Sequence, residues 1–283
     1  MKGKGMSHGA ATIVNAIAGG KGAAFGLDLR TEATVELTTG NGIVVTMDGL
    51  PSEATSLAER CVQGVLEAKG GNRSYHAEVR TTSQIPVSRG LKSSSSAANA
   101  IVLATLDALG ETMDRLDAIR IGTKAALDAG VSITGAFDDA CACAMGGVVL
   151  TDNRSERVLY RSRMPDYIKA VVHVPDGQIR KSDLPRKRIS AVRGLVDLAF
   201  KQAQEGDHYR ALTLNGMCYS TALGLDQEIA LQALQNGALA AGLTGTGPAT
   251  VMLVVEDKVH EFMGSMKEYQ LRVVDVFNGE GTE

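Results

Sequence analysis

A short loop that contains glycine, residues 86–92, runs directly into four consecutive serines and an alanine-rich segment. That segment predicts a helix over residues 93–109. A helix start leaves backbone N–H groups unpaired and carries about half a positive charge, so it can bind an anion. Taken alone, the junction is equally consistent with serines that cap a helix and with Lys92 as a solvated surface charge. It is not a P-loop, because no G-x-x-x-x-G-K-S/T occurs in the chain.

The rest of the chain alternates between strand-like and helix-like segments. β-Branched stretches punctuated by glycine predict strands, and apolar residues three and four apart predict helices. The expected strands are residues 10–18, 23–29, 33–38, 43–47, 75–82, 147–150, 158–162, 168–174, 249–255 and 271–277. The expected helices are residues 53–69, 93–109, 114–129, 138–145, 189–205, 208–222, 226–236 and 258–269, with a loop at 175–188. This order predicts an α+β protein. Polar residues at 151–157 separate two α/β sets, which predicts domains 1–152 and 153–283.

Composition excludes several classes of protein. Hydrophobic residues make up 44% and charged residues 22% of the 283, which is ordinary for a globular chain. The formal net charge of −3 provides no basic field for nucleic acid or an anionic membrane, so a small-molecule partner is favoured. No apolar run reaches the ~18 residues of a membrane span. Four cysteines without a secretory leader predict reduced thiols and a cytoplasmic protein, and the sequence leaves the oligomeric state open.

The loop and the helix start resemble a known phosphate-binding motif. Residues 86–98, PVSRGLKSSSSAA, resemble the P-x-x-x-G-L-G-S-S-A-A motif of the GHMP kinases, a superfamily that includes galactokinase, homoserine kinase and mevalonate kinase. Lys92 stands where that motif usually has a second glycine, which resembles the GLKSSSA variant of archaeal shikimate kinases. The resemblance implies an ATP site, with Mg²⁺ on Ser94, that is formed by Pro86, Val87, Ser88, Arg89, Gly90, Leu91, Lys92, Ser93, Ser94, Ser95 and Ser96.

Two further segments resemble GHMP motifs in the same order along the chain. Residues 242–248, GLTGTGP, resemble the third motif, a glycine-rich turn that folds against the nucleotide loop and the substrate. Residues 12–26 resemble the first motif in its archaeal shikimate kinase form. Either glycine cluster alone could be an ordinary turn, but three ordered matches argue against coincidence. Substrate contact or closure of the site is then expected from Asn15, Asp139, Thr244, Gly245, Thr246 and Gly247.

Two adjacent carboxylates, Asp138 and Asp139, follow a glycine turn at a predicted helix start. Aspartate at this place can cap a helix, but a kinase also needs a carboxylate that takes or orients the proton of the attacking hydroxyl. Galactokinase-like members carry that residue in a similar G-x-x-D segment. The resemblance therefore implies that Asp138 is catalytic and that Asp139 supports it or contacts magnesium. Adjacent helical residues point ~100° apart, so we do not expect both to meet one proton.

The resemblance covers nearly the whole chain and implies a GHMP kinase fold. Its N-terminal half would be like ribosomal protein S5 domain 2, its C-terminal half ferredoxin-like, and ATP would lie between them. Lys92 and the retained Asp138 favour a shikimate kinase that forms 3-phosphoshikimate and ADP. A homoserine or mevalonate-like acceptor and a non-catalytic metabolite sensor of the same fold remain as alternatives. A shikimate carboxylate calls for an arginine, and the basic candidates are Arg30, Arg180, Lys181, Arg186, Lys187, Arg188 and Arg193.

Overall fold

The computed structural model describes residues 1–47, 53–70, 74–177, 179 and 184–279. Its ten strands form one sheet, whose main path is β3-β4-β2-β10-β7-β9-β8, while β1, β5 and β6 pair off this path. The strands are β1 (Lys2–Val14), β2 (Lys21–Thr39), β3 (Gly42–Met47), β4 (Tyr75–Ser83), β5 (Val148–Asp152), β6 (Arg157–Ser162), β7 (Ile168–His173), β8 (Ala240–Leu243), β9 (Thr250–Val255) and β10 (Leu271–Phe277).

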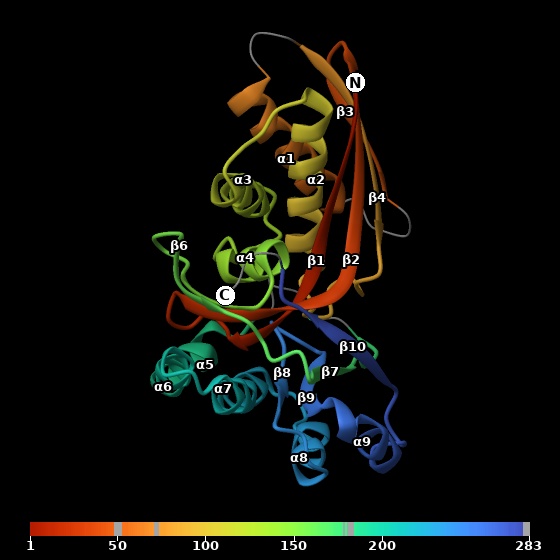
Figure 1. Ribbon diagram of the computed structural model, residues 1–283. Helices are drawn as coiled ribbons and strands as arrows, with labels where there is room; N and C mark the ends of the chain where they lie inside the picture. The colour runs from red at the N-terminus through yellow and green to blue at the C-terminus, as the bar shows by residue number, and fades with distance from the viewer. Residues whose placement is uncertain (48–52, 71–73, 178, 180–183, 280–283) are drawn as a thin grey trace.

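Helices cover this sheet in two groups, one beside each half (Figure 1). They are α1 (Glu53–Lys69), α2 (Ser93–Leu109), α3 (Arg115–Asp128), α4 (Phe137–Met145), α5 (Arg186–Ala191), α6 (Arg193–Gln204), α7 (His208–Leu223), α8 (Glu228–Gln235) and α9 (Val259–Ser265), with a 3₁₀ turn at Glu256–Lys258. The mixture of helices and antiparallel strands confirms the α+β prediction. None of the helices described is long and apolar enough to cross a membrane.

The long strand β2 joins the two halves of the molecule. β1 covers one edge of it, while β5, β10 and β4 pair antiparallel with successive parts of the other edge. We expected two strands, 23–29 and 33–38, and the structure has one continuous strand. Burial explains why they looked separate, because residues 22–27 are buried without interruption whereas residues 33–38 alternate between buried and partly or fully exposed.

The first strand also differs from the prediction of 10–18, because β1 begins at Lys2 and ends at Val14. Gly3 and Gly5 near its start look like breaks in a strand, but they allow close packing against α2. A Cβ on Gly3 or Gly5 would collide with the backbone of α2. The absence of a side chain thus lets the C-terminal part of α2 lie directly on β1.

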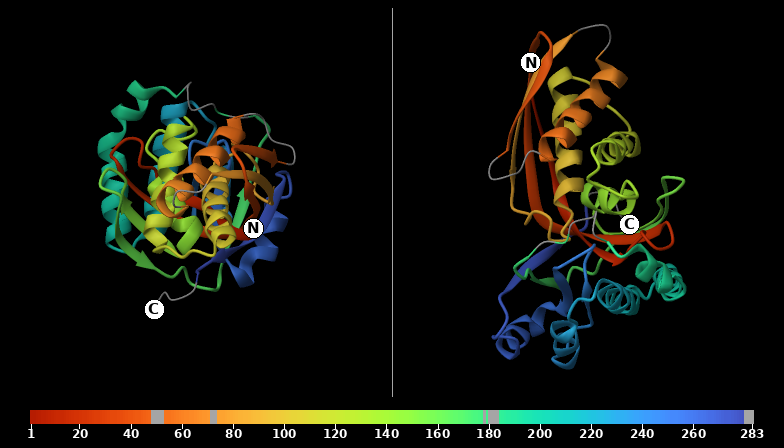
Figure 2. Two further views of the ribbon diagram at one scale, coloured as in Figure 1. Left: turned by 90° about the horizontal axis from the view of Figure 1, so that it is seen from above. Right: turned by 180° about the vertical axis from the view of Figure 1, so that it is seen from behind.

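Three helices, α1, α2 and α3, pack together on one face of the N-terminal half (Figure 2). Their apolar side chains share a core with β2 and β4, which includes Val35, Leu57, Val79 and Ile101. α2 is the most buried of them, since it carries few polar residues after its serines. The predicted bounds of α1 and α2 agree with the structure. The loop 86–92 is therefore anchored to a helix that cannot shift without disturbing this core.

The C-terminal half places β10, β7, β9 and β8 side by side. Alternate residues of β7 and β9 face two different cores, one shared with α6 and α7 and one with α8 and α9. β8 was not predicted, because its four residues are too short to give a pattern. The single helix expected at 189–205 is two helices, α5 and α6, and α5 begins inside the expected loop 175–188.

The predicted boundary between residues 152 and 153 falls inside a hairpin. β5 ends at Asp152, and β6 pairs with it antiparallel from Arg157 onward. Both strands belong to the part of the sheet that contains β2. The division into domains 1–152 and 153–283 remains a prediction.

Candidate functional site

The N-terminus of α2 presents the predicted serine cluster. Ser93 and Ser94 are partly exposed, whereas Ser95 and Ser96 are buried. The Oγ atom of Ser96 has no hydrogen-bond partner among the described residues. The preceding loop, residues 86–92, turns through left-handed backbone at three positions, with φ of 57° at Ser88, 89° at Gly90 and 66° at Lys92. The loop then leads into α2 without a capping side chain at Lys92, and the first N–H groups of a helix, which lack helical partners, can bind an anion.

The loop is held in place by the third glycine-rich segment. The Thr244 hydroxyl donates to the carbonyl oxygen of Gly90 at 3.0 Å and accepts from the Thr12 N–H at 2.9 Å. A Cβ on Gly90 would collide with the carbonyl of Thr244, so this approach requires glycine. Three segments far apart in the sequence thus meet at one point. We call this point, formed by Thr12, Gly90, Lys92, Thr244 and Gly245, the loop junction.

Lys92 turns into the loop junction. Its Nζ lies 2.5 Å from the Thr12 hydroxyl and 3.0 Å from Asp139 Oδ1, and the residue is 9% exposed. The Thr12 hydroxyl also accepts from the Gly245 N–H at 2.9 Å. The sequence suggested a mobile charge beside the phosphates, whereas the structure holds this ammonium against two partners, Thr12 and Asp139. Its left-handed φ also explains why related motifs place glycine here.

Asn15 joins the first segment to the third. Its side-chain Nδ2 donates to the carbonyl of Gly245 at 2.9 Å, and its Oδ1 accepts from the N–H of Ile17 at 3.0 Å. Its own N–H donates to Asn215 Oδ1. Thr246 is partly exposed and Gly247 is buried in the same turn. The structure therefore assembles Asn15 and residues 244–247 as one unit, although their contact with substrate remains a prediction.

Asp138 is a buried carboxylate on the first turn of α4. The residue is 4% exposed, and its Oδ1 accepts from Asn153 Nδ2 at 2.7 Å. Its carboxylate lies against Gly22 of β2, where any side chain would collide with it. Burial, and then the charge of Asp139, raise the pKa of Asp138 to about 7, while Lys92 and the Asn153 hydrogen bond act in the opposite direction. Such a carboxyl changes its protonation state near neutral pH, as a general base requires.

The two neighbouring carboxylates have different surroundings. Asp139 faces Lys92 and the loop junction, and its Oδ1 has no hydrogen-bonding partner among the described residues apart from the ion pair with that ammonium. Asp138 faces β2 and Asn153. The helix begins after Ala136, which has a left-handed φ of 52° and no capping side chain. The two carboxylates therefore contact different partners, consistent with the ~100° rotation between helical neighbours.

A small cavity of about 190 Å³ is bordered by Asn153, the hydrogen-bond partner of Asp138. It is lined by Ala16, Ile17, Gly20, Thr134, Asn153 and Arg154. Because Asn153 also binds Asp138, the cavity and the buried carboxylate share one side chain. We call it the Asn153 cavity. Sequence analysis missed Asn153 and Arg154, since both stand in the polar stretch 151–157 that was interpreted as a boundary.

The basic residues expected near a substrate carboxylate are arranged differently. Arg30 pairs with Asp28 at 2.9 Å, and Arg193 lies 3.6 Å from Asp197. Arg188 donates to the carbonyl of Thr221. Arg186 and Lys187 are exposed on α5, and Arg180 and Lys181 lie outside the described residues. None of those described lines the Asn153 cavity.

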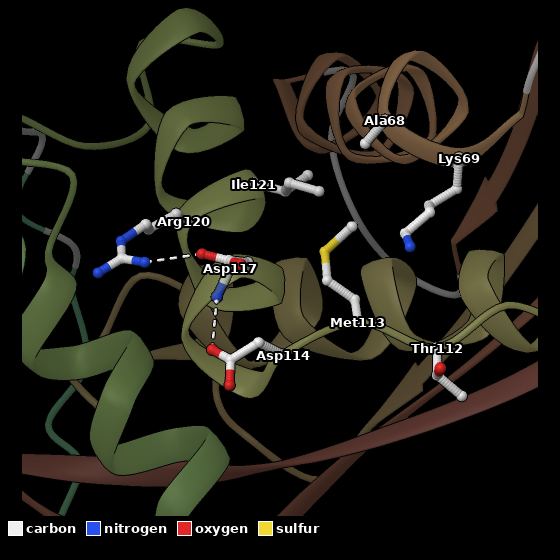
Figure 3. A pocket seen from close by; sticks show the side chains of 8 residues that line it. All are labelled: Ala68, Lys69, Thr112, Met113, Asp114, Asp117, Arg120 and Ile121. Carbon is white, nitrogen blue, oxygen red and sulfur yellow. Dashed lines mark hydrogen bonds and ion pairs between the residues drawn. The ribbon is translucent and has the colours of Figure 1, made fainter.

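A larger cavity of about 500 Å³ lies between α1 and α3, and it contains none of the motif residues. Figure 3 shows its lining, in which Arg120 pairs with Asp117 at 2.7 Å and Asp114 accepts from the N–H of Asp117. Opposite charges thus neutralise each other at this surface. No group of three or more His, Cys, Asp or Glu side chains that could hold a metal occurs in the part of the chain described.

Comparisons with known proteins identify the family of the chain. Residues 56–147 match the GHMP kinases N terminal domain family. A shikimate kinase of Methanothrix thermoacetophila is 48% identical over 254 residues, which cover 90% of this chain and 86% of that protein. A second, from Methanosarcina mazei, is 42% identical over 100% of this chain and 99% of its own.

The fold was also compared with solved structures. A homoserine kinase from Cytophaga hutchinsonii superposes with a TM-score of 0.77 at 19% identity, over 98% of this chain and 96% of its own. This likeness confirms the GHMP kinase fold expected from the sequence. The sequence identities and the shared fold lead to one conclusion: the chain belongs to the archaeal shikimate kinases, a family of GHMP kinases.

Proposed function

We propose that this protein transfers the γ-phosphate of ATP to the 3-hydroxyl of shikimate, which yields 3-phosphoshikimate and ADP. One observation carries the proposal: adjacent carboxylates connect an anion site to a small cavity. Asp139 contacts Lys92, which precedes α2, and Asp138 contacts Asn153, which lines the cavity. A phosphate donor on one side and an alcohol on the other would meet at this pair.

The donor side suits the phosphates of ATP. The N-terminus of α2 offers unpaired N–H groups and a positive dipole, and the partly exposed serines add hydroxyls. The rest of the nucleotide would contact the preceding loop. The buried Ser96 hydroxyl that lacks a partner is one group that a ligand could satisfy through a small rearrangement.

Mg²⁺ would be held largely by ATP itself. This ion usually keeps several waters and takes only one or two protein ligands beside the phosphates. The hydroxyl of Ser94, partly exposed at the start of α2, and the carboxylate of Asp139, whose Oδ1 pairs with Lys92, are the oxygen donors that fit. Bound there, the ion would neutralise charge that develops on the transferring phosphate.

The acceptor side needs a residue that takes a proton. As the hydroxyl oxygen forms its bond to the γ-phosphorus, the bond to the bridging oxygen breaks and ADP leaves with that electron pair. The hydroxyl proton moves to Asp138, whose pKa near 7 leaves a large fraction ionised at neutral pH. Asn153 would orient the carboxylate and the acceptor together, because it contacts one and borders the space for the other.

An acceptor panel tests this function. Purified protein is mixed with ATP and Mg²⁺ and offered shikimate, homoserine or mevalonate, and ADP release is followed. We expect turnover with shikimate, a product whose phosphate is on the 3-hydroxyl, and loss of turnover when EDTA removes Mg²⁺. Turnover with homoserine or mevalonate in preference to shikimate would overturn the choice of acceptor, and binding of ATP without ADP release for any acceptor would favour the sensor alternative.

A further inference from the structure

Arg154 occupies a fixed position in the turn between β5 and β6. The Asp152 carboxylate accepts from the N–H of Arg154 at 3.0 Å and from the N–H of Ser155 at 3.3 Å, which locks the turn. The side chain then extends over Gly20, and a Cβ at that glycine would collide with the guanidinium Nε. A glycine with φ of 81° therefore forms the surface on which the guanidinium lies.

This guanidinium has no carboxylate partner among the residues that the structure describes. Several other arginines have one, in the pairs Arg30–Asp28, Arg120–Asp117, Arg163–Asp166, Arg193–Asp197 and Arg210–Asp207, whereas others, such as the exposed Arg157, have none in the described part of the chain. Arg154 instead lines the Asn153 cavity, next to an uncharged amide and small apolar residues. An unpaired planar cation at the wall of a small cavity can bind a carboxylate through two parallel hydrogen bonds.

We infer that Arg154 binds the carboxylate of the acceptor and thereby selects hydroxy acids over neutral alcohols. The inference rests on the proposed function, and it adds the residue that the sequence did not identify. Asn153 and Arg154 are neighbours in the same turn, so a hydroxy acid held by Arg154 would place its hydroxyls toward Asn153 and Asp138. The cavity of about 190 Å³ is smaller than sites for drug-sized ligands, which suits a small metabolite.

The test compares two acceptors in four proteins. The acceptors are shikimate and its methyl ester, which lacks the negative charge. The proteins are wild type, Arg154→Gln, Arg154→Lys and the control Arg157→Gln, whose arginine is exposed on the same hairpin and does not line the cavity. KM and kcat are measured for each acceptor, and KM is measured for ATP.

We expect Arg154→Gln to raise the KM for shikimate about 10- to 100-fold, with the KM for ATP unchanged. Wild type should use the ester less well by a similar factor, and this preference should disappear in Arg154→Gln. Arg154→Lys should lie between them, because it keeps the charge but loses the planar fork. Arg157→Gln should behave as wild type.

Two kinds of failure are distinguishable. If wild type does not phosphorylate shikimate, the proposed function fails and the inference fails with it. If wild type is active but Arg154→Gln lowers activity with shikimate and with the ester equally, Arg154 only supports the turn, and the inference alone is overturned. An unchanged KM for shikimate in Arg154→Gln would overturn it as well.

Discussion

The loop junction contacts Asp139, the Asn153 cavity is linked to Asp138 through Asn153, and the two regions are built in contrasting ways. At the loop junction every polar side chain has a partner within the protein, and glycines allow backbone to touch backbone. At the Asn153 cavity the polar groups are few and Arg154 has no described ion-pair partner. The first region is complete without a ligand, whereas the second has bonding capacity left over.

This difference suggests separate tasks for the two regions: phosphoryl transfer at the loop junction and the choice of acceptor at the Asn153 cavity. Phosphoryl transfer depends on positioning and charge neutralisation, so its machinery must be rigid before substrates arrive. The choice of acceptor depends on which groups remain unpaired in the cavity. A change at the loop junction should therefore reduce activity with every acceptor, whereas a change in the cavity should alter the preference among acceptors.

The largest effect should come from Asp138→Asn, which removes the carboxylate that we propose as the proton acceptor. We expect turnover to fall by about 10²- to 10⁴-fold, the usual contribution of a general base, while ATP still binds. Steady-state kinetics and ATP titration measure the two quantities. Asp257→Asn, at an exposed position, is the control. Near-normal turnover in Asp138→Asn would exclude this residue and direct attention to Asp139.

Gly90→Ala should come next, because it breaks the loop junction without touching the cavity. The new Cβ would collide with the carbonyl of Thr244 and would also sit at a φ of 89°. We expect ATP affinity to fall about 100-fold and stability to fall by about 3 kcal/mol. Gly110→Ala is the matched control, since its φ of 69° imposes similar strain but nothing lies within 4 Å of the added carbon. Equal effects in both variants would mean that the contact with Thr244 is unimportant.

Lys92 allows charge and backbone strain to be separated. Lys92→Gly and Lys92→Ala both remove the ammonium that neutralises Asp139, so both should lose turnover about 10-fold or more with every acceptor. Only glycine relieves the left-handed φ of 66°, so the glycine variant should be about 1 kcal/mol more stable than the alanine variant in urea unfolding. If the alanine variant is the more stable, the strain argument fails.

The smallest effect should be a pH-dependent gain in stability in Asp138→Asn. The pKa of Asp138 is raised to about 7 in the folded protein, above its usual value of 3.8. A raised pKa stabilises the fold at low pH, and that stability is lost as the pH rises through the folded pKa. The variant should therefore melt a few degrees above wild type at pH 8, with a smaller difference at pH 5. A constant difference across this range would contradict the assigned pKa.

Local patterns predicted the helices better than the strands. The bounds of α1 and α2 followed from their sequences because helical periodicity is local. The extent of β1 did not, because Gly3 and Gly5, which look like breaks, are explained only by contact with α2, and β2 looked like two strands because its burial pattern changes along its length. β8 is held by β9 and gives almost no signal of its own.

In the site, too, local motifs could be predicted from the sequence, whereas contacts between distant residues could not. The serine-rich helix start and the acidic pair were visible as motifs. The inward direction of Lys92 was not, since it depends on Thr12 and Asp139, which are distant in sequence. Asn153 and Arg154 looked like linker residues until the fold brought them beside Gly20.

The shared strand β2 has a consequence for how such an enzyme can be taken apart or recombined. The edge of β2 is divided among β5, β10 and β4, and β10 comes from the far end of the chain. A protein cut after Asp152 would yield a first fragment with part of that edge bare, and bare edges invite aggregation. Grafting a foreign C-terminal half would meet the same obstacle. New acceptor preferences are therefore more accessible by exchanging the short turn around Arg154 than by shuffling halves.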